Sequence, residues 1–287
     1  MPLAHFVSDL HGRLSRFEKL FAAVGRERPS GVFIGGDLLP HISTSRQAPP
    51  SEPDGFIHGF LETSLQELRR ELGASYPRIF VILGNDDPGD EEAAVQAAAS
   101  RGLWEYVHGR TAEFGTFTVY GYACVPPTPF LRKDWERYDV SRYVDPGAVS
   151  PEEGFRSLPA PEHEIRYATI RNDLDRLAGN NDLTRAIFLF HSPPYRTSLD
   201  LSAQGGRQID HVPLDPHLGS IAVRRFIEER QPLLTLHGHV HESARLAGTW
   251  RDRLGRTHCF QGAHDGPELA LVRFDPEIPE SAARELL

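Results

Sequence analysis

The chain has 287 residues, a length that fits one large domain or two small ones, and we expect a single domain spanning 1–287. Its 31 basic and 40 acidic residues give a formal charge of −9 without any block of like charge, which disfavours tight binding of duplex nucleic acid. Cys124 and Cys259 lie far apart in the sequence, so neither a disulfide framework nor a zinc–cysteine site is expected. Because the N-terminus lacks a signal pattern and no apolar run is long enough to span a bilayer, we expect a soluble, cytoplasmic protein.

In the first half of the chain, short apolar runs alternate with amphipathic segments. Apolar residues three or four apart predict helices, and short apolar runs that end in glycine or a polar residue predict strands. The expected order is a strand at 3–8, a helix at 13–28, a strand at 31–37, a helix at 56–72, a strand from 78, a helix at 91–101 and hairpin-like extended chain at 113–123.

The second half begins with a segment of weak periodicity. Residues 126–161 are rich in proline, aromatic and charged residues, which is typical of an inserted lobe or a long ordered loop. After it we expect a helix at 164–178, a strand in 185–194, a loop at 204–216, a helix at 218–230, a strand in 232–241, and closing antiparallel strands within 244–263 and 268–275.

This order of elements predicts an α/β sandwich in which helices cover a sheet core. In such folds, ligands bind at the loops that follow the carboxyl ends of strands. Polar residues of ligand type follow five of the expected strands: Asp9 with His11, Asp37, Asn85, His191, and His239 with His241. Each cluster alone has an ordinary interpretation as a helix cap, a turn residue or a structural histidine.

Together the five clusters supply seven oxygen and nitrogen donors and no thiolate. On extended chain, Asp9 and His11 are two residues apart and would point to the same side, and so would His239 and His241. Gly238 would let the backbone approach closely. Such a set suits two divalent ions, Mn²⁺, Fe or Zn²⁺, better than one.

The motifs D-x-H, G-D, G-N-x-[DE], a lone histidine after a strand and G-H-x-H occur in this order across most of the chain. In this respect the sequence resembles the calcineurin-like metallophosphoesterase superfamily. The resemblance implies a four-layer α/β/β/α sandwich with two mixed sheets and a metal site at the carboxyl ends of strands. It also implies a first metal held by Asp9, His11 and His241, a bridging Asp37, and a second metal held by Asn85, His191 and His239. The implied reaction is hydrolysis of a small or nucleotide-like phosphoester by a metal-bridging hydroxide.

The sequence departs from this superfamily at Asp86, where many members carry a histidine that stabilises the phosphate and protonates the leaving group. An ionised aspartate repels a phosphate dianion, so we expect a phosphodiesterase whose proton donor is a metal-bound water or another histidine, or one whose leaving group is good. His41, in "GDLLPH", stands where protein phosphatases carry a phosphate-contacting arginine and is the first replacement to test. The candidate catalytic residues are therefore His41, Asp86 and Asp87, with the role of Asp87 open. A phosphomonoesterase and a non-catalytic metal-binding scaffold of the same fold are the alternatives.

Weaker candidates lie elsewhere in the chain. His211 and His217 flank the loop before the 218–230 helix, whose start either offers N–H groups to an anion or is an ordinary cap. The aromatic residues Trp135, Tyr138, Tyr143 and Phe155 of the 126–161 segment either pack as a satellite cluster or stack on a nucleobase or aryl group. A nuclease of the same superfamily is disfavoured by the acidic charge, and no membrane partner is expected.

Overall fold

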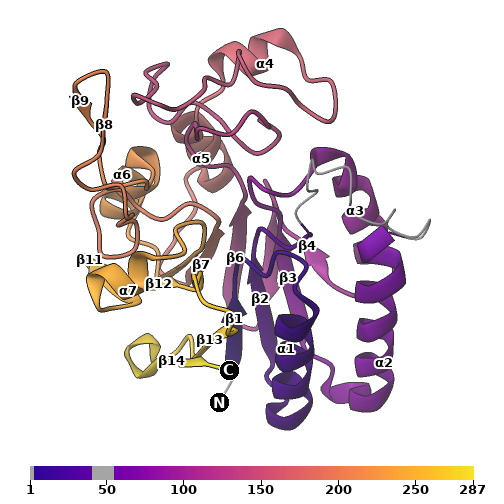
Figure 1. The fold of residues 1–287 in the computed structure, drawn as a ribbon. Helices are drawn as coiled ribbons and strands as arrows, with labels where there is room; N and C mark the ends of the chain where they lie inside the picture. Colours follow the sequence, from indigo (N-terminus) through magenta and orange to yellow (C-terminus); the bar gives the residue numbers. More distant parts are fainter. Residues whose placement is uncertain (1–2, 41–54) are drawn as a thin grey trace.

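The computed structural model describes residues 3–40 and 55–287, and its strands form two six-stranded mixed sheets and a small two-stranded one (Figure 1). The first large sheet has the order β14-β13-β1-β2-β3-β4, in which β1 to β4 are parallel and β13 and β14 are antiparallel. Its strands are β1 (Ala4–Val7), β2 (Gly31–Gly35), β3 (Arg78–Ile82), β4 (Glu105–Tyr106), β13 (Ala270–Phe274) and β14 (Ala283–Leu286).

The second large sheet has the order β11-β12-β10-β7-β6-β5, with four parallel strands in the middle and an antiparallel strand at each edge. Its strands are β5 (Thr111–Phe114), β6 (Phe117–Tyr122), β7 (Ala186–Phe190), β10 (Leu234–His237), β11 (Arg251–Leu254) and β12 (Thr257–Gln261). The small sheet pairs β8 (Gln208–Ile209) with β9 (Val212–Pro213). The central strand β7 is a continuous buried apolar run, and β3 is one after its exposed Arg78, as is typical of parallel strands covered on both faces.

Helices cover the outer face of each sheet (Figure 1). On the first sheet lie α1 (Leu14–Glu27), α2 (Thr63–Leu72) and α3 (Glu92–Ser100), and a π-helical segment, Ile57–Glu62, leads into α2. On the second lie α5 (Ile170–Ala178) and α6 (Ile221–Arg230), and the remaining helices are the short α4 (Glu162–Tyr167) and α7 (Ser243–Ala247). Single 3₁₀ turns occur at Gly73–Ser75, Gly89–Glu91 and Pro279–Ser281.

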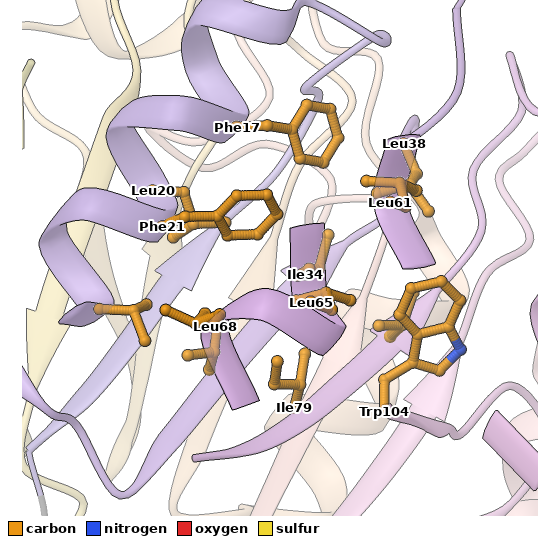
Figure 2. A pocket seen from close by; sticks show the side chains of 13 residues that line it. Phe17, Leu20, Phe21, Ile34, Leu38, Leu61, Leu65, Leu68, Ile79 and Trp104 are labelled. Carbon is orange, nitrogen blue, oxygen red and sulfur yellow. The ribbon is translucent and has the colours of Figure 1, made fainter. Parts of the chain in front are cut away.

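The two sheets pack face to face through aromatic side chains. Phe33 of β2 contacts the rings of Phe114 of β5 and Phe274 of β13, and Phe260 of β12 also contacts Phe274. Between α1, α2 and the first sheet, the core leaves an apolar cavity of about 10 Å³ (Figure 2). That volume is close to that of one water molecule and its walls carry no polar partner, so it is a packing gap and not a ligand site. The expected four-layer α/β/β/α sandwich is therefore confirmed.

Two of the expected elements differ in detail. The helix expected at 164–178 is broken into α4 and α5 because Thr169 is extended (φ −129°) and its side chain caps α5 by accepting the N–H of Asn172 at 3.2 Å. The stretch expected to open the closing strands contains α7, which ends at Gly248 in the left-handed conformation (φ 71°). β12 is antiparallel to β11 as expected, but parallel to β10 on its other side.

The 126–161 segment, all of which is described, contains no helix and none of the named strands. It is held in place by isolated bridges, such as Arg132 with Phe155 and Tyr138 with Thr169. It is also held by a buried ion pair between Lys133 and Glu136, in which Lys133 Nζ additionally donates to the Thr128 carbonyl at 2.9 Å. Trp135 and Tyr138 are buried, whereas Tyr143 and Phe155 are exposed. The segment is thus an ordered loop with its own polar core.

Candidate metal centre

The seven candidate ligands all follow the carboxyl ends of parallel strands, namely β1, β2, β3, β7 and β10. Four of them, Asp9 (φ 57°), His11 (φ 49°), Asp37 (φ 49°) and His239 (φ 72°), have left-handed backbones. The expectation that Asp9 and His11 point to one side because their chain is extended is therefore wrong, and so is the same expectation for His239 and His241. Asp9 and His11 lie in a turn whose N–H groups bind the loop after β2, with Asp9 N donating to Gly36 O at 3.0 Å and His11 N to Asp37 O at 2.8 Å.

Glycines make room for this arrangement. A Cβ on Gly84 would overlap Asp37 and come within 2.7 Å of His191 Nε2, and a Cβ on Gly238 would overlap the Ser8 hydroxyl and come within 2.5 Å of Asp9 Oδ2. Any side chain at either position would displace a candidate ligand. Gly84 and Gly238 are therefore required by the close approach of neighbouring loops.

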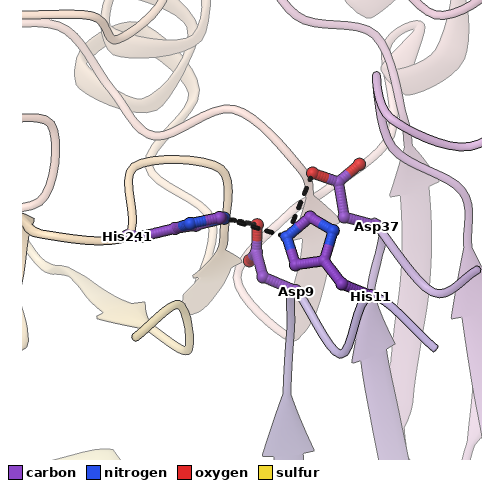
Figure 3. A group of neighbouring side chains, drawn as sticks. All are labelled: Asp9, His11, Asp37 and His241. Carbon is purple, nitrogen blue, oxygen red and sulfur yellow. Dashed lines mark hydrogen bonds and ion pairs between the residues drawn. The ribbon is translucent and has the colours of Figure 1, made fainter. Parts of the chain in front are cut away.

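A first group of donors consists of Asp9, His11, Asp37 and His241, each of which offers one ligand atom within 4.8 Å of the others (Figure 3). His241 Nε2 lies 3.0 Å from Asp9 Oδ1 and 3.1 Å from His11 Nε2. His11 Nε2 lies 3.9 Å from Asp37 Oδ2. Imidazole nitrogens and carboxylate oxygens that converge on one point are the donors that Mn²⁺, Fe and Zn²⁺ take in proteins.

A second group surrounds His191, which is fully buried. Its Nδ1 donates to the Gly35 carbonyl at 2.7 Å, because a carbonyl can only accept. In the neutral ring the lone pair of Nε2 then faces Asn85 Oδ1 at 3.1 Å and Asp37 Oδ2 at 3.3 Å, which are also acceptors. A cation between the three atoms satisfies all of them. The His239 ring lies beside the His191 ring, with centroids 5.3 Å apart.

The pKa values of the candidate ligands also indicate that the site favours positive charge. Burial alone would raise the pKa of Asp9, but the hydrogen bond and charge of His241 and the charges of His191 and His11 lower it well below its usual value. Burial alone would lower the pKa of His191, yet the charge and hydrogen bond of Asp37 raise it to about 10. His239 behaves oppositely, since burial and the nearby His191 lower its pKa to about 4, so it is a neutral, ligand-competent imidazole. The donor set therefore fits two divalent cations.

The three candidate catalytic residues have different environments. His41 lies outside the described residues. Asp86 lies at the edge of the centre, with its Oδ2 3.8 Å from His11 Nδ1 and its carbonyl accepting from Arg132 Nη1 at 3.0 Å. Asp87 is fully buried, and its carboxylate accepts the N–H groups of Leu38 (3.1 Å), Leu39 (2.8 Å) and Gly84 (2.8 Å). This geometry favours a positioning role for Asp87 over direct contact with a substrate.

A cavity of about 510 Å³ opens over the centre, a volume that suits a small-molecule ligand. It is lined by Asp37, Asn85, His239 and His241 together with residues of the 126–161 segment and of the loop 204–219. None of the described residues that line it is a lysine or arginine, whereas Asp86, Asp145, Asp215 and Glu242 are acidic. Phe130 and the exposed Tyr143 add aromatic surface.

Two residues near the site were missed by sequence reasoning. Arg132 is 46 positions from Asp86, whose carbonyl it binds, and Asp200 is 17 positions from its partner His217, so no local pattern connects either pair. Of the weaker candidates, His217 lines the cavity, whereas His211 does not. His237 is a buried structural residue that bonds to Ser192 O and Thr235 Oγ1.

Comparison with known proteins places this geometry in a family. The family model described as calcineurin-like phosphoesterase matches residues 4–243. A search of curated proteins found no significant match. No helix among the described residues is both long and apolar enough to cross a membrane.

Among solved structures, the protein TT1561 of Thermus thermophilus is 16% identical, with 99% of this chain and 98% of that chain covered and a TM-score of 0.56. A dimetal phosphatase from Danio rerio is 14% identical, with 94% of both chains covered and a TM-score of 0.51. At these identities the likeness concerns the fold. The family match extends from β1 through the G-H-x-H motif and so includes every candidate ligand, and the chain belongs to the calcineurin-like phosphoesterase family.

Proposed function

We propose that this protein is a binuclear-metal phosphohydrolase that acts as a phosphodiesterase on a small or nucleotide-like phosphoester. The observation that carries the proposal is the position of Asp37 between the two donor groups. Its Oδ2 lies 3.9 Å from His11 Nε2 of the first group and 3.3 Å from His191 Nε2 of the second. A carboxylate in this position could be shared by two ions, and two-metal hydrolases hold their ions about 3.5–4 Å apart.

In this proposal Asp9, His11 and His241 hold one ion, Asn85, His191 and His239 hold the other, and Asp37 is shared. When bound, Mn²⁺, Fe or Zn²⁺ would lower the pKa of a coordinated water and neutralise charge on the phosphoryl oxygens. The protein's own contribution is to fix the donors. Gly35 O orients the His191 ring. The backbone nitrogen of His239 lies 3.1 Å from both carboxylate oxygens of Asp9 and so orients that carboxylate.

The charge of the cavity favours a diester over a monoester. A phosphomonoester is a dianion near neutral pH, whereas a diester carries one negative charge fewer. The described cavity lining offers no lysine or arginine to a second negative charge, and Asp86 would repel it. A phosphate contact by His41 is part of the proposal. Nucleic acid remains a disfavoured substrate because the chain and the cavity are both acidic.

The test is hydrolysis by purified protein reconstituted with Mn²⁺, with bis(p-nitrophenyl) phosphate as the diester and p-nitrophenyl phosphate as the monoester. We expect the diester to give the higher kcat/KM, and Asp37→Asn to lower it by about 100-fold or more, because even indirect metal partners contribute 10- to 100-fold. The control is Asp182→Asn, an exposed aspartate before the amino end of β7, the strand end opposite His191. Faster hydrolysis of the monoester would replace the diesterase assignment with a monoesterase. Absence of turnover together with near-zero metal content would favour the scaffold and overturn the proposal.

A further inference from the structure

Asp200 is a buried carboxylate that organises the loop over the cavity. It is fully buried and accepts backbone N–H groups from Arg196 (2.8 Å), Thr197 (2.9 Å) and Gly219 (3.1 Å). Because all three of these backbone N–H groups donate, the Asp200 carboxylate is the acceptor in each bond. Its fourth contact is His217 Nδ1, 2.9 Å from Asp200 Oδ1, so in this contact the imidazole nitrogen must donate.

This bond fixes the orientation of the His217 ring. With Nδ1–H directed at Asp200, Nε2 lies on the opposite edge of the ring, and no described residue forms a hydrogen bond to it. The His217 side chain is 26% exposed and lines the same cavity as Asp37, Asn85 and His239. The backbone N–H of His217 donates to Asp215 Oδ1 at 2.9 Å, which is a second bond that holds the residue in place.

We propose that His217, oriented by Asp200, donates the proton to the leaving-group oxygen, the role that Asp86 is chemically unsuited to fill. The inference rests on the proposed phosphodiesterase function. In this step water supplies the oxygen that bonds to phosphorus and releases a proton. The bond from phosphorus to the leaving oxygen breaks with its electron pair on that oxygen, which takes the proton from His217 Nε2. The products are an alcohol and a phosphomonoester, and His217 regains its proton from solvent.

The other groups that line the cavity suit this role less well. His239 and His241 are candidate metal ligands. Glu242 accepts the Ala203 N–H, and Asp215 accepts the Tyr195 hydroxyl and the His217 N–H, so both carboxylates are occupied as acceptors. Asp145 is the competitor, because burial and the charge of Asp215 raise its pKa and so favour its protonated form. Among the described lining residues, His217 is the imidazole left over for acid catalysis.

The variant that isolates the proton is His217→Asn. The asparagine amide can still donate to Asp200, but it has no counterpart of Nε2. Methyl aryl phosphodiesters with a graded series of phenols would be assayed in the Mn²⁺-loaded protein. A good leaving group such as p-nitrophenolate departs without a proton, whereas phenolate needs one, so we expect a loss of about 100-fold or more for phenol and only a few-fold for p-nitrophenol. His163→Asn, an exposed histidine of α4, is the matched control and should change neither rate.

Two further measurements separate the possible outcomes. Metal content and the free energy of unfolding should match the wild type in His217→Asn, and proton NMR of the Zn²⁺-loaded protein should show a downfield Nδ1–H resonance that this variant lacks. An active wild type with an equal loss for all phenols, or with none, would overturn the assignment of His217 and leave the phosphodiesterase intact. A selective loss in Asp145→Asn instead would transfer the role to Asp145. A wild type that hydrolyses no diester would overturn both proposals.

Discussion

Asp87 joins the loop after β2, which carries the candidate ligand Asp37, to the loop after β3, which carries the candidate ligand Asn85. Its Oδ2 accepts from Gly84 N and Leu38 N, and its Oδ1 accepts from Leu39 N. Gly84 precedes Asn85, and Leu38 follows Asp37. One buried side chain therefore fixes the backbone beside two candidate ligands, Asp37 and Asn85. Replacing Asp87 tests whether it positions them.

These bonds indicate how much Asp87→Asn should lower the free energy of unfolding. The amide oxygen can take the place of Oδ2 and keep two N–H donors, but the amide NH₂ then faces the N–H of Leu39, donor to donor. One unsatisfied buried donor costs about 1–3 kcal/mol of unfolding free energy. Asp87→Ala leaves three donors unsatisfied and should cost more. Metal affinity should fall by about 10- to 100-fold, as for other groups that orient ligands.

The assay is urea unfolding of the metal-free protein together with calorimetric titration of Mn²⁺. The control is Asp90→Asn, an exposed aspartate three positions further along the chain. Asp87 has no positioning role if Asp87→Asn unfolds within about 0.5 kcal/mol of the wild type, the range of ordinary surface substitutions, and binds Mn²⁺ with unchanged affinity.

Three further predictions concern the surroundings of the site. Asp134 accepts hydrogen bonds from Gly89 N, Ser157 N and Ser157 Oγ and so links the 126–161 segment to the loop after Asp87. Asp134→Ala should speed hydrogen exchange of the Gly89 and Ser157 amides by about tenfold or more, and unchanged exchange would contradict this prediction. Lys133→Met leaves Glu136 buried without its cation and should cost about 3–5 kcal/mol in urea unfolding, and Lys133→Met with Glu136→Gln should recover part of that loss. The paired guanidinium of Arg273 lowers the pKa of Glu27 from 4.5 to about 2, so the stabilisation from this ion pair is complete above about pH 4.5 and is lost as the pH falls towards 2. Glu27→Gln should therefore flatten the pH dependence of the unfolding free energy in that window, and an unchanged slope would contradict the prediction.

The regular part of the fold was predictable because it depends on local patterns. The apolar spacing of Leu14, Phe17, Leu20 and Val24 marks α1, and the apolar run of β7 marks a buried strand. Thr169 shows where such patterns fail, since apolar residues continue across it and only its capping bond and its bridge to Tyr138 break the helix. The two-residue β4 is too short to give a periodic signal. β14 has three exposed positions and one half-buried one, so no apolar face marks it.

The candidate ligands were predictable from short motifs, but the residues that support them were not. Asp9, His11, Asp37 and His241 are brought together in the structure as the motifs indicated. Asp200 and Arg132 have no such motif, because their roles depend on partners that only the folded chain supplies. A buried carboxylate that accepts several N–H groups has the same sequence signature as any turn aspartate.

Four of the candidate ligands, Asp9, His11, Asp37 and His239, have left-handed backbones that no motif predicts. Outside glycine, such conformations cost on the order of 1–3 kcal/mol each where the surroundings do not relieve them, and aspartate and histidine are among the residues that tolerate them best. Local sequence patterns do not mark which aspartates and histidines adopt them, and the bonds of Asp9 and His11 to the loop after β2 are what hold two of the four. These turned backbones follow β1, β2 and β10, where Asp9, His11, Asp37 and His241 bring their ligand atoms within 4.8 Å of one another. Short motifs thus indicated the candidate ligands, whereas the turned backbone that presents four of them depends on contacts between loops that only the folded chain supplies.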